Sequence, residues 1–333
     1  MKCNCLIIVL IVLFFLNCSS SLAIDPQSAA FSLAAENKNI NNITEVKKVE
    51  DLIQGLEKAW NNHDFKELTK YFSDDFVNGD GLKFEEVKNL TEDLWAGFPD
   101  IKTSSQERLT RVYGDYATVN STDIYQGTTK TPRAEVDSKG ILKAVSVGEV
   151  FLKKFGPSWK ITSDKTLYEK VTIAFGIGNE LVDQNKIRLS APEQVISGKQ
   201  YTARLEFDLP SDVKPVAAIT KELLIYPQVQ SDDKFRLVDK QELERLFSSN
   251  KLSKNELVTA TVGLTGGPLQ PKLLGLLFLS RRVNIIPISS GVSEISIIKE
   301  PAKSALNQGI DLPDTNINDK EESIKQNNTK DNN

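Results

Sequence analysis

The chain has 333 residues, of which 40% are hydrophobic and 26% charged, and its formal net charge at pH 7 is −4. This composition is typical of a soluble globular protein, and the length allows about two domains. Lysine and arginine are scattered among acidic residues and form no basic patch with interleaved aromatic residues, so we expect no nucleic-acid partner.

The first 23 residues have the pattern of a signal peptide. Lys2 precedes an apolar run at residues 6–16, which is too short to span a bilayer comfortably but has the length of a signal-peptide core. Cleavage after Ala23 would release a soluble exported protein. Cleavage before Cys18 would instead leave a lipid on that cysteine, because Cys18 and the serines after it resemble the tether of a bacterial lipoprotein. Both alternatives predict export, to the periplasm, the medium or a lipid-anchored position at the membrane.

The cysteines of the chain, Cys3, Cys5 and Cys18, all lie in this leader. We therefore expect no disulfide and no cysteine-based nucleophile or metal ligand in the folded part. The single histidine, His63, stands without cysteines beside it, which argues against a transition-metal site. We accordingly expect neither a metal nor another cofactor.

Residues 24–44 are polar and rich in asparagine, which predicts a flexible tether. Apolar residues then recur at three- and four-residue spacing, so we predict three helices that each bury one face. These residues are Val46, Val49, Leu52, Ile53, Leu56 and Trp60; Phe65, Leu68, Tyr71 and Phe72; and Phe84, Val87, Leu90, Leu94 and Trp95. Asp64 and Glu67 have the spacing of a capping box for the second helix, which places His63 just outside the cap and exposed to solvent.

From Ser104 onward the apolar residues alternate with polar ones, and turns at Gly114 and Gly156 divide the alternating segments. This pattern predicts antiparallel hairpins. Helices followed by a strand meander indicate an α+β domain over residues 45–175, in which the helices pack on one face of a strongly bent sheet.

The remaining chain is predicted to be a linker, an all-β sandwich and a tail. Residues 176–186 lack an apolar period, so we place the linker there. Residues 187–290 contain short strands at a spacing typical of a β-sandwich. One helix is expected within them, because Asp239 and Glu242 fit an N-cap and capping-box pair. Residues 291–333 are too polar to offset their ordering entropy by burial and are expected to be disordered.

The sequence AWNNHDFKELTKYFSDDF at residues 59–76, with the third predicted helix and the hairpin ending GPSWKI, resembles the nuclear transport factor 2-like superfamily. That group includes ketosteroid isomerases and SnoaL-like polyketide cyclases, and the resemblance covers roughly residues 46–173. It implies a cone-shaped, curved antiparallel sheet with three helices, and a pocket whose lining differs between members. Candidate lining residues are Trp60, Tyr71, Phe76, Trp95, Phe98, Asp123 and Tyr125. The aromatic ones would serve equally as core side chains, and Asp123 could face the cone or water.

The catalytic positions of ketosteroid isomerases match this chain only in part. The first oxyanion donor, a tyrosine, corresponds to Leu56, which has no proton to give, and the nearest match to the second donor is Glu149. The base corresponds to Asp80, the one candidate catalytic residue, although Asn78-Gly79-Asp80-Gly81 is also a common turn sequence. We expect the isomerase mechanism not to carry over, because a base without a donor leaves the enolate unstabilised.

The second predicted domain resembles an immunoglobulin-like sandwich of the kind appended to exported bacterial proteins. These observations favour a non-enzymatic exported module of the cell envelope that binds a small apolar ligand or a protein partner. Two alternatives stay open: an isomerase, dehydratase or cyclase of the SnoaL-like type that uses a pocket carboxylate, and a structural envelope protein. The resemblance also allows a homodimer, and a membrane contact is expected only through the lipid anchor.

Overall fold

The computed structural model describes residues 32–288 except 228–233, 239–240 and 268–270. The predicted signal peptide with Cys18, the first part of the predicted tether and the predicted tail at residues 291–333 lie outside the described residues. Among the helices that are described, none is long and apolar enough to cross a membrane.

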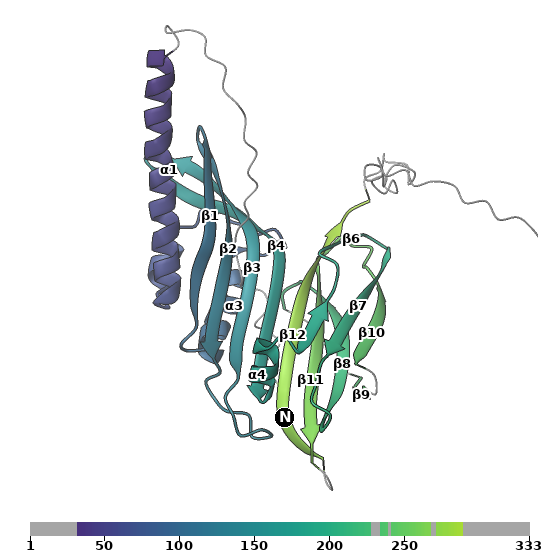
Figure 1. Cartoon of the computed structure of the whole chain (residues 1–333). Helices are drawn as coiled ribbons and strands as arrows, with labels where there is room; N and C mark the ends of the chain where they lie inside the picture. Colours follow the sequence, from purple (N-terminus) through teal and green to yellow (C-terminus); the bar gives the residue numbers. More distant parts are fainter. Residues whose placement is uncertain (1–31, 228–233, 239–240, 268–270, 289–333) are drawn as a thin grey trace, which may run out of the picture. The chain divides into compact units, whose positions relative to one another are not determined.

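Three helices come first in the chain (Figure 1): α1 (Ser32–Asn61), α2 (Phe65–Thr69) and α3 (Phe84–Gly97). α1 begins earlier than predicted, so residues 32–44 are helical and the tether prediction is wrong for them. Starting a helix costs much conformational entropy for the first hydrogen bond, whereas each residue added to an existing helix gains a hydrogen bond of its own. Polar residues next to the packed part of α1 can therefore extend the helix. α2 is shorter than predicted, and Phe72 instead forms a backbone bridge to Ile161.

Two long antiparallel hairpins follow: β1 (Lys102–Tyr113), β2 (Tyr116–Thr128), β3 (Ile141–Phe155) and β4 (Ser158–Gly176). Both turns fall at the predicted glycines, since Gly114 and Gly156 have φ values of 63° and 61°, a left-handed conformation that glycine adopts without strain. The predicted α+β architecture with a large antiparallel sheet is therefore confirmed.

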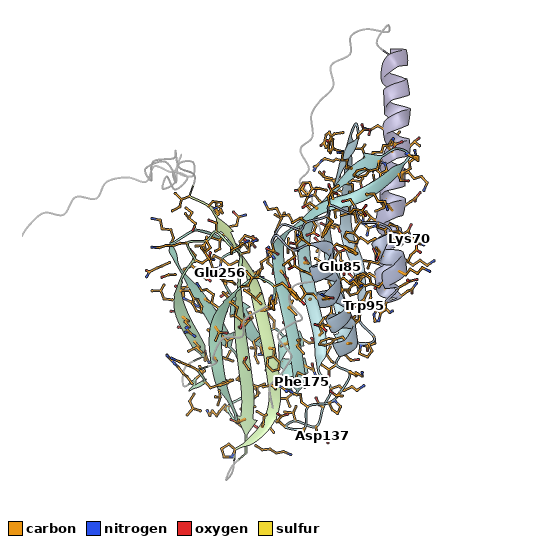
Figure 2. The ribbon with its side chains drawn as sticks, turned by 180° about the vertical axis from the view of Figure 1, so that it is seen from behind. Lys70, Glu85, Trp95, Asp137, Phe175 and Glu256 are labelled. Atoms are coloured by element: carbon orange, nitrogen blue, oxygen red, sulfur yellow. The ribbon has the colours of Figure 1, made fainter. Side chains whose placement is uncertain are left out.

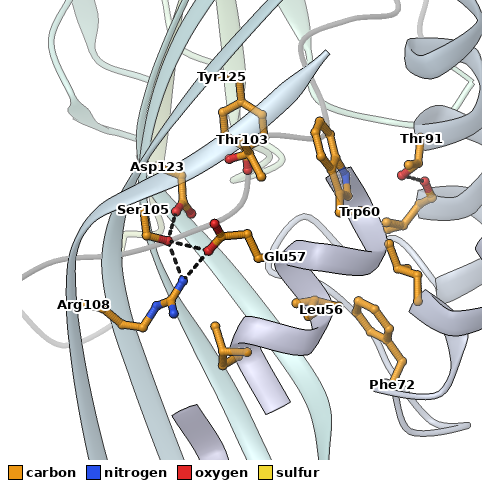
Figure 3. Close-up of a pocket in the computed structure, with 13 residues that line it drawn as sticks. Leu56, Glu57, Trp60, Phe72, Thr91, Thr103, Ser105, Arg108, Asp123 and Tyr125 are labelled. Carbon is orange, nitrogen blue, oxygen red and sulfur yellow. Dashed lines mark hydrogen bonds and ion pairs between the residues drawn. The ribbon is translucent and has the colours of Figure 1, made fainter. Parts of the chain in front are cut away.

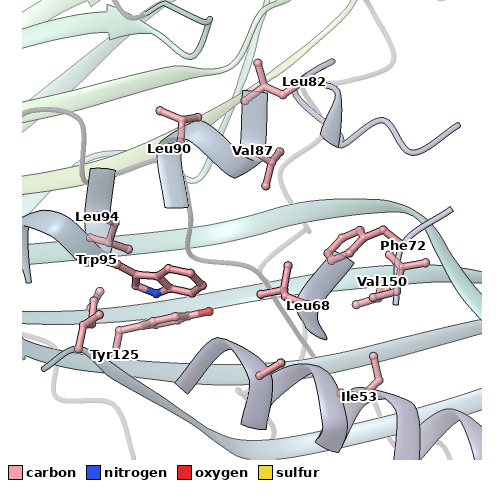
Figure 4. Close-up of a cluster of buried hydrophobic side chains, with 14 of the residues drawn as sticks. Ile53, Leu68, Phe72, Leu82, Val87, Leu90, Leu94, Trp95, Tyr125 and Val150 are labelled. Atoms are coloured by element: carbon pink, nitrogen blue, oxygen red, sulfur yellow. The ribbon is translucent and has the colours of Figure 1, made fainter. Parts of the chain in front are cut away.

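The three helices and one face of β1–β4 share a hydrophobic core (Figure 4). Buried residues of this core come from every one of these elements except β1: Ile53, Leu68, Leu90, Leu94, Val119, Val150 and Ile161. The apolar faces of the helices, predicted from the sequence, therefore pack against the sheet. The inner side of β1 and β2 lies opposite α1.

The large sheet continues beyond the predicted linker. A short helix, α4 (Gly178–Asp183), stands where the linker was expected, and β4 pairs with β12 (Lys272–Ile286). The strand order is β1-β2-β3-β4-β12-β11-β8-β9, with β11 (Glu256–Gly266), β8 (Val213–Leu223) and β9 (Arg236–Leu237), and β6 (Gln194–Ile196) pairs with β12 in parallel. Phe175 of β4, labelled in Figure 2, packs edge-on against Phe278 of β12 with 6.3 Å between ring centroids. Residues predicted to form two separate domains thus share one sheet.

A second, three-stranded sheet consists of β10 (Glu242–Ser248), β7 (Gln200–Phe207) and β5 (Ile187–Ser190). Its inner side chains share a core with β8, β11 and β12, for example Leu205 and Phe247 with Val262 and Leu277. This part contains strands as predicted, and the immunoglobulin-like assignment stays a prediction.

The helix predicted around residues 239–247 is wrong, because residues 242–248 form β10 and pair with β7 along their whole length. Leu243 and Phe247 both face the second core. Residues four apart share a face in a helix and in a strand alike, so their spacing could not distinguish the two.

Candidate functional site

A cavity of about 60 Å³ lies between α1, α2, α3 and the first two strands (Figure 3). This is several times the space that one water molecule needs. Apolar side chains form most of its wall: Ile53, Leu56, Trp60, Leu68, Phe72, Val87 and Tyr125. Five polar residues gather on one side, Glu57, Thr103, Ser105, Arg108 and Asp123, and a sixth, Thr91 of α3, lies across the cavity from them. An apolar pocket with a few convergent polar groups is the usual form of a small-molecule site.

A β-bulge in β1 brings two of the polar side chains to the cavity. Ser105 and Arg108 are three residues apart, so in a regular strand they would point to opposite faces. The register of β1 against β2 shifts between Ser105 and Glu107, which sets Ser105 opposite Asp123 and Arg108 opposite Ser121. The extra residue therefore turns both side chains toward the same side of the sheet.

Four of the polar side chains form one hydrogen-bonded group, drawn with dashed lines in Figure 3. Arg108 Nη2 donates to Glu57 Oε2 at 2.7 Å and to Ser105 Oγ at 2.6 Å. Ser105 Oγ in turn donates to Asp123 Oδ1 at 2.5 Å. Glu57 comes from α1, and the other three come from β1 and β2, so the group ties the helix to the sheet.

Burial, the largest cause, and the nearby Glu57 carboxylate raise the pKa of Asp123, while the Ser105 hydrogen bond and the Arg108 charge lower it, and the resulting pKa is about 8. At pH 7 the Asp123 carboxyl is therefore mostly protonated, so it can donate a hydrogen bond as well as accept one. Thr103 Oγ1, also on the cavity wall, is buried and has no hydrogen-bond partner among the described residues. The cavity thus offers hydrogen-bonding groups to a polar atom placed inside it.

The predicted lining residues divide into two groups. Trp60, Asp123 and Tyr125 line the cavity. The other four contribute to the surrounding core instead: Tyr71, Phe76, Trp95 and Phe98. Large rings at helical spacing fill the space between helices and sheet, and this is what leaves the cavity small.

Asp80 lies outside this cavity, in a buried ion pair. Its carboxylate accepts hydrogen bonds from Arg282 Nη1 and Nη2 at 3.0 and 2.6 Å and from Asn255 Nδ2 at 2.8 Å. Burial alone would raise the pKa of Asp80, but the Arg282 charge and hydrogen bonds outweigh it, so the pKa is lowered. A carboxylate held this way is a structural group that joins the loop before α3 to β12. Asp80 therefore occupies no place from which it could act on a molecule in the cavity.

Two further residues weighed in the sequence are also placed away from the cavity. Glu149 pairs in register with Asn120, whereas Asp123 pairs with Ser146, so Glu149 faces the opposite side of the sheet from Asp123. His63 is half-buried, not exposed as expected: its ring stacks on Trp95 with centroids 4.7 Å apart.

The predicted cap of α2 is formed in part. Asp64 Oδ1 accepts the backbone N–H of Glu67 at 2.9 Å, as the N-cap prediction requires. Glu67 does not complete the box, because its carboxylate accepts from Lys70 and Tyr71 instead.

Five polar residues of the site were missed in the sequence: Glu57, Thr91, Thr103, Ser105 and Arg108. Glu57 follows the buried Ile53 by four residues, a spacing that puts it on the buried stripe of α1 and could have identified it. Ser105 and Arg108 gave no such signal, because only the bulge brings them to one face.

No family model and no curated protein matches the sequence. Among solved structures, Bd1075 from Bdellovibrio bacteriovorus is 15% identical over 36% of this chain and 39% of its own, with a TM-score of 0.31. The hexachlorocyclohexane dehydrochlorinase LinA-type3 from Novosphingobium barchaimii is 15% identical over 37% of this chain and 86% of its own, with a TM-score of 0.31. A protein of the NTF2-like (nuclear transport factor 2-like) family from Streptomyces avermitilis is 16% identical over 38% of this chain and 96% of its own, with a TM-score of 0.30.

These structural neighbours include the NTF2-like type and correspond to somewhat over a third of this chain. The match to Bd1075 spans less than half of that chain. Function is therefore inferred below from the cavity itself.

Proposed function

We propose that this protein binds a small, uncharged molecule in the cavity between α1 and the sheet. The observation that carries the proposal is a buried, mostly neutral carboxyl, Asp123, in a cavity whose wall is mostly apolar. A buried polar group without a full set of partners is costly unless something supplies them. A ligand with one hydroxyl or carbonyl group would supply a partner to Asp123 and Thr103, while its apolar body would contact Trp60 and Leu56.

The charges around the cavity restrict the ligand to uncharged compounds. Glu57 and Arg108 neutralise each other at 2.7 Å, and Asp123 is mostly protonated at pH 7. A charged ligand would lose its hydration without gaining a free counter-charge, which makes its burial unfavourable. The volume of about 60 Å³ is less than half of the ~150 Å³ that holds a benzene ring, so only one end of a ring compound enters the cavity.

Isothermal titration with phenol, toluene and benzoate tests this proposal. We expect phenol to bind more tightly than toluene, because toluene lacks the hydroxyl, and benzoate to bind least. Asp123→Leu, which removes both the donor and the acceptor, should weaken phenol binding by roughly tenfold. Thr122→Ala, one residue away on the other face of β2, should leave it unchanged. Equal affinities for the three compounds, or equal effects of the two substitutions, would contradict the proposal.

A second candidate function is acid–base catalysis of the isomerase or dehydratase type, and the position of Asp123 favours it over Asp80. A carboxyl with a pKa near neutrality suits a proton-transfer residue, and the cavity places it within reach of a bound molecule. Ser105 holds the carboxyl at 2.5 Å and would orient it.

Deuterium exchange at the carbon next to the carbonyl of cyclohexanone measures such proton transfer directly. The ionised carboxylate is the base, so the catalysed exchange should rise with pH and level off above about pH 8, the pKa of Asp123. Asp123→Asn should abolish the catalysed part. If cyclohexanone binds but its deuterium exchange is not accelerated, the result would favour a non-enzymatic binding function.

We also propose that the protein is exported, on the basis of its leader. Further candidates for what it binds are a protein partner of the cell envelope and a second copy of the chain. Metabolic labelling with a palmitate analogue distinguishes the two leaders. Incorporation that is lost in Cys18→Ser supports the lipid anchor, whereas an unlabelled mature protein that starts near Ile24 supports cleavage after Ala23.

A further inference from the structure

Exposed aromatic rings gather at the tips of the two long hairpins. Tyr113 and Tyr116 flank the β1–β2 turn and are 62% and 60% exposed, and Phe155 begins the β3–β4 turn and is 44% exposed. The tips are neighbours, because Tyr116 pairs with Lys153 across β2 and β3. Lys153 Nζ lies 5.8 Å from the Tyr116 ring centroid and 5.5 Å from that of Phe155. We call these four residues the hairpin-tip patch.

The hairpin-tip patch stands on a firmly held base and points into open space. Directly beneath it, Glu45 of α1 binds Lys154 Nζ at 3.0 Å and accepts the indole N–H of Trp159 at 2.8 Å. At both turn glycines, Gly114 and Gly156, an added Cβ would meet no atom within 4 Å. The turns beside the rings therefore stand in open space, and the Tyr113 and Tyr116 rings are mostly exposed.

The charge around the patch is opposite to that of the whole protein. The two tip segments, residues 111–116 and 153–160, contain the basic residues Arg111, Lys153, Lys154 and Lys160 and one acidic residue, Asp115, in a chain of net charge −4. Glu45 neutralises Lys154, so an excess of two basic residues remains. Basic side chains next to exposed aromatic rings match a surface that is anionic outside and partly apolar just below.

We propose that the hairpin-tip patch docks on the surface of an anionic phospholipid bilayer. Three rings on two narrow turns offer roughly 300 Å² of surface at these exposures, well below the ~800 Å² per partner of a standard protein–protein interface. A bilayer interface needs no such area, since individual tyrosine and phenylalanine rings settle at the headgroup level and lysines bind the phosphates.

The position of the patch along the chain also fits a bilayer as its binding partner. Glu45, beneath the patch, lies thirteen residues after α1 begins at Ser32, or about 20 Å along the helix, so the start of α1 extends past the hairpin tips (Figure 1). The apolar run at residues 6–16 precedes that point. A leader or lipid held in a bilayer would keep the patch near the same bilayer.

Sedimentation with lipid vesicles tests the proposal on the full chain. All variants carry Leu10→Asp and Leu13→Asp, so that the apolar run does not insert by itself. We expect the chain to bind vesicles of phosphatidylcholine with about 30% phosphatidylserine more tightly than vesicles of phosphatidylcholine alone. Joint substitution of Tyr113, Tyr116 and Phe155 by Ser should lower the partition coefficient at least about tenfold. Lys153→Gln should lower it about fivefold, and only with phosphatidylserine present.

The matched control replaces three apolar residues exposed elsewhere, Leu237, Leu246 and Leu252, by Ser and should bind as the parent does. Thermal unfolding must be unchanged in both triple variants, since none of the replaced side chains is buried. No binding by the parent, or equal binding by the two triple variants, would overturn the proposal. If the tip variant still bound vesicles but no longer pulled down an envelope protein that the parent pulls down, the rings would be assigned to a protein partner instead.

Discussion

Two buried aspartates show how surroundings decide what a carboxyl group can do. Asp80 faces the Arg282 guanidinium, which holds its pKa below the ordinary value despite burial. Asp123 faces a cavity, and there Arg108 is already engaged by Glu57, so burial dominates and the pKa is raised to about 8. The first residue is therefore a fixed charge in a structural pair, and the second is a group whose proton can be exchanged near neutral pH.

Replacement of Asp123 by Asn should stabilise the protein at alkaline pH. The folded state keeps the Asp123 proton up to about pH 8, whereas the unfolded chain loses it near pH 4. The folded state therefore binds more protons in this window, and the free energy of unfolding falls as pH rises from 4 to 8. Asp123→Asn removes this dependence, so we expect a gain of at least about 1 kcal/mol at pH 8 and little change at pH 4.

Urea unfolding of both proteins across this pH range measures the difference. Asp115→Asn, an exposed aspartate on a hairpin turn, is the control and should leave the pH dependence as it is. Parallel curves for Asp123→Asn and the unsubstituted protein would show that Asp123 ionises normally in the fold.

At the level of elements, the sequence predicted what depends on periodicity and missed what depends on pairing. The stripes of α1 and α3 and the glycine turns of both hairpins are local patterns, and they were predicted correctly. β10 was misassigned because its apolar spacing of four fits two geometries and only its partner β7 decides between them. The site follows the same division: Asp123 and Tyr125 alternate regularly on β2, whereas Ser105 and Arg108 depend on a bulge that no local pattern announces.

Glu45 should be the contact that holds the first half of α1 to the β3–β4 hairpin. Hydrogen bonds from Lys48 and Lys154 lower the pKa of Glu45 to about 2, and Trp159 donates to the same carboxylate. A lowered folded-state pKa means that this stabilisation is present above about pH 4.5 and is lost as pH falls toward 2. Glu45→Gln should therefore cost about 1 kcal/mol at pH 7 and nothing near pH 2.

Hydrogen exchange of α1 amides is the measurement, since a loosened contact should speed exchange in the first turns of the helix before the rest. Asp51→Asn is the control, because Asp51 forms an ion pair with Lys47, four residues earlier on an exposed face of α1. Unchanged exchange in Glu45→Gln at pH 7 would contradict this role.

For the whole molecule, one arginine holds together parts of the chain that were expected to be separate. β4 and β12 pair only between residues 170–176 and 275–281, and beyond that point Arg282 of β12 faces three buried carboxyl groups. Asp80 is ionised, whereas burial raises the pKa of Asp164 well above its ordinary value and that of Glu169 to about 8. One positive charge is therefore matched by one negative charge near neutral pH. This joint could not be predicted from sequence, because Asp80 and Arg282 are 202 residues apart.

Arg282→Met should be the most destabilising single substitution at this joint. It leaves the Asp80 carboxylate buried without its charge partner, which typically costs about 3–5 kcal/mol. Asp80→Asn in the same chain removes the unpaired charge, so the double variant should recover most of that loss, because the uncompensated buried charge is its main cause. Arg281→Met, one residue earlier on β12, removes a cation–π contact to Tyr168 at 4.2 Å and should cost only about 1 kcal/mol. Urea unfolding at pH 7 compares the four proteins, and a double variant no more stable than Arg282→Met would mean that the arginine acts through packing and not through its charge.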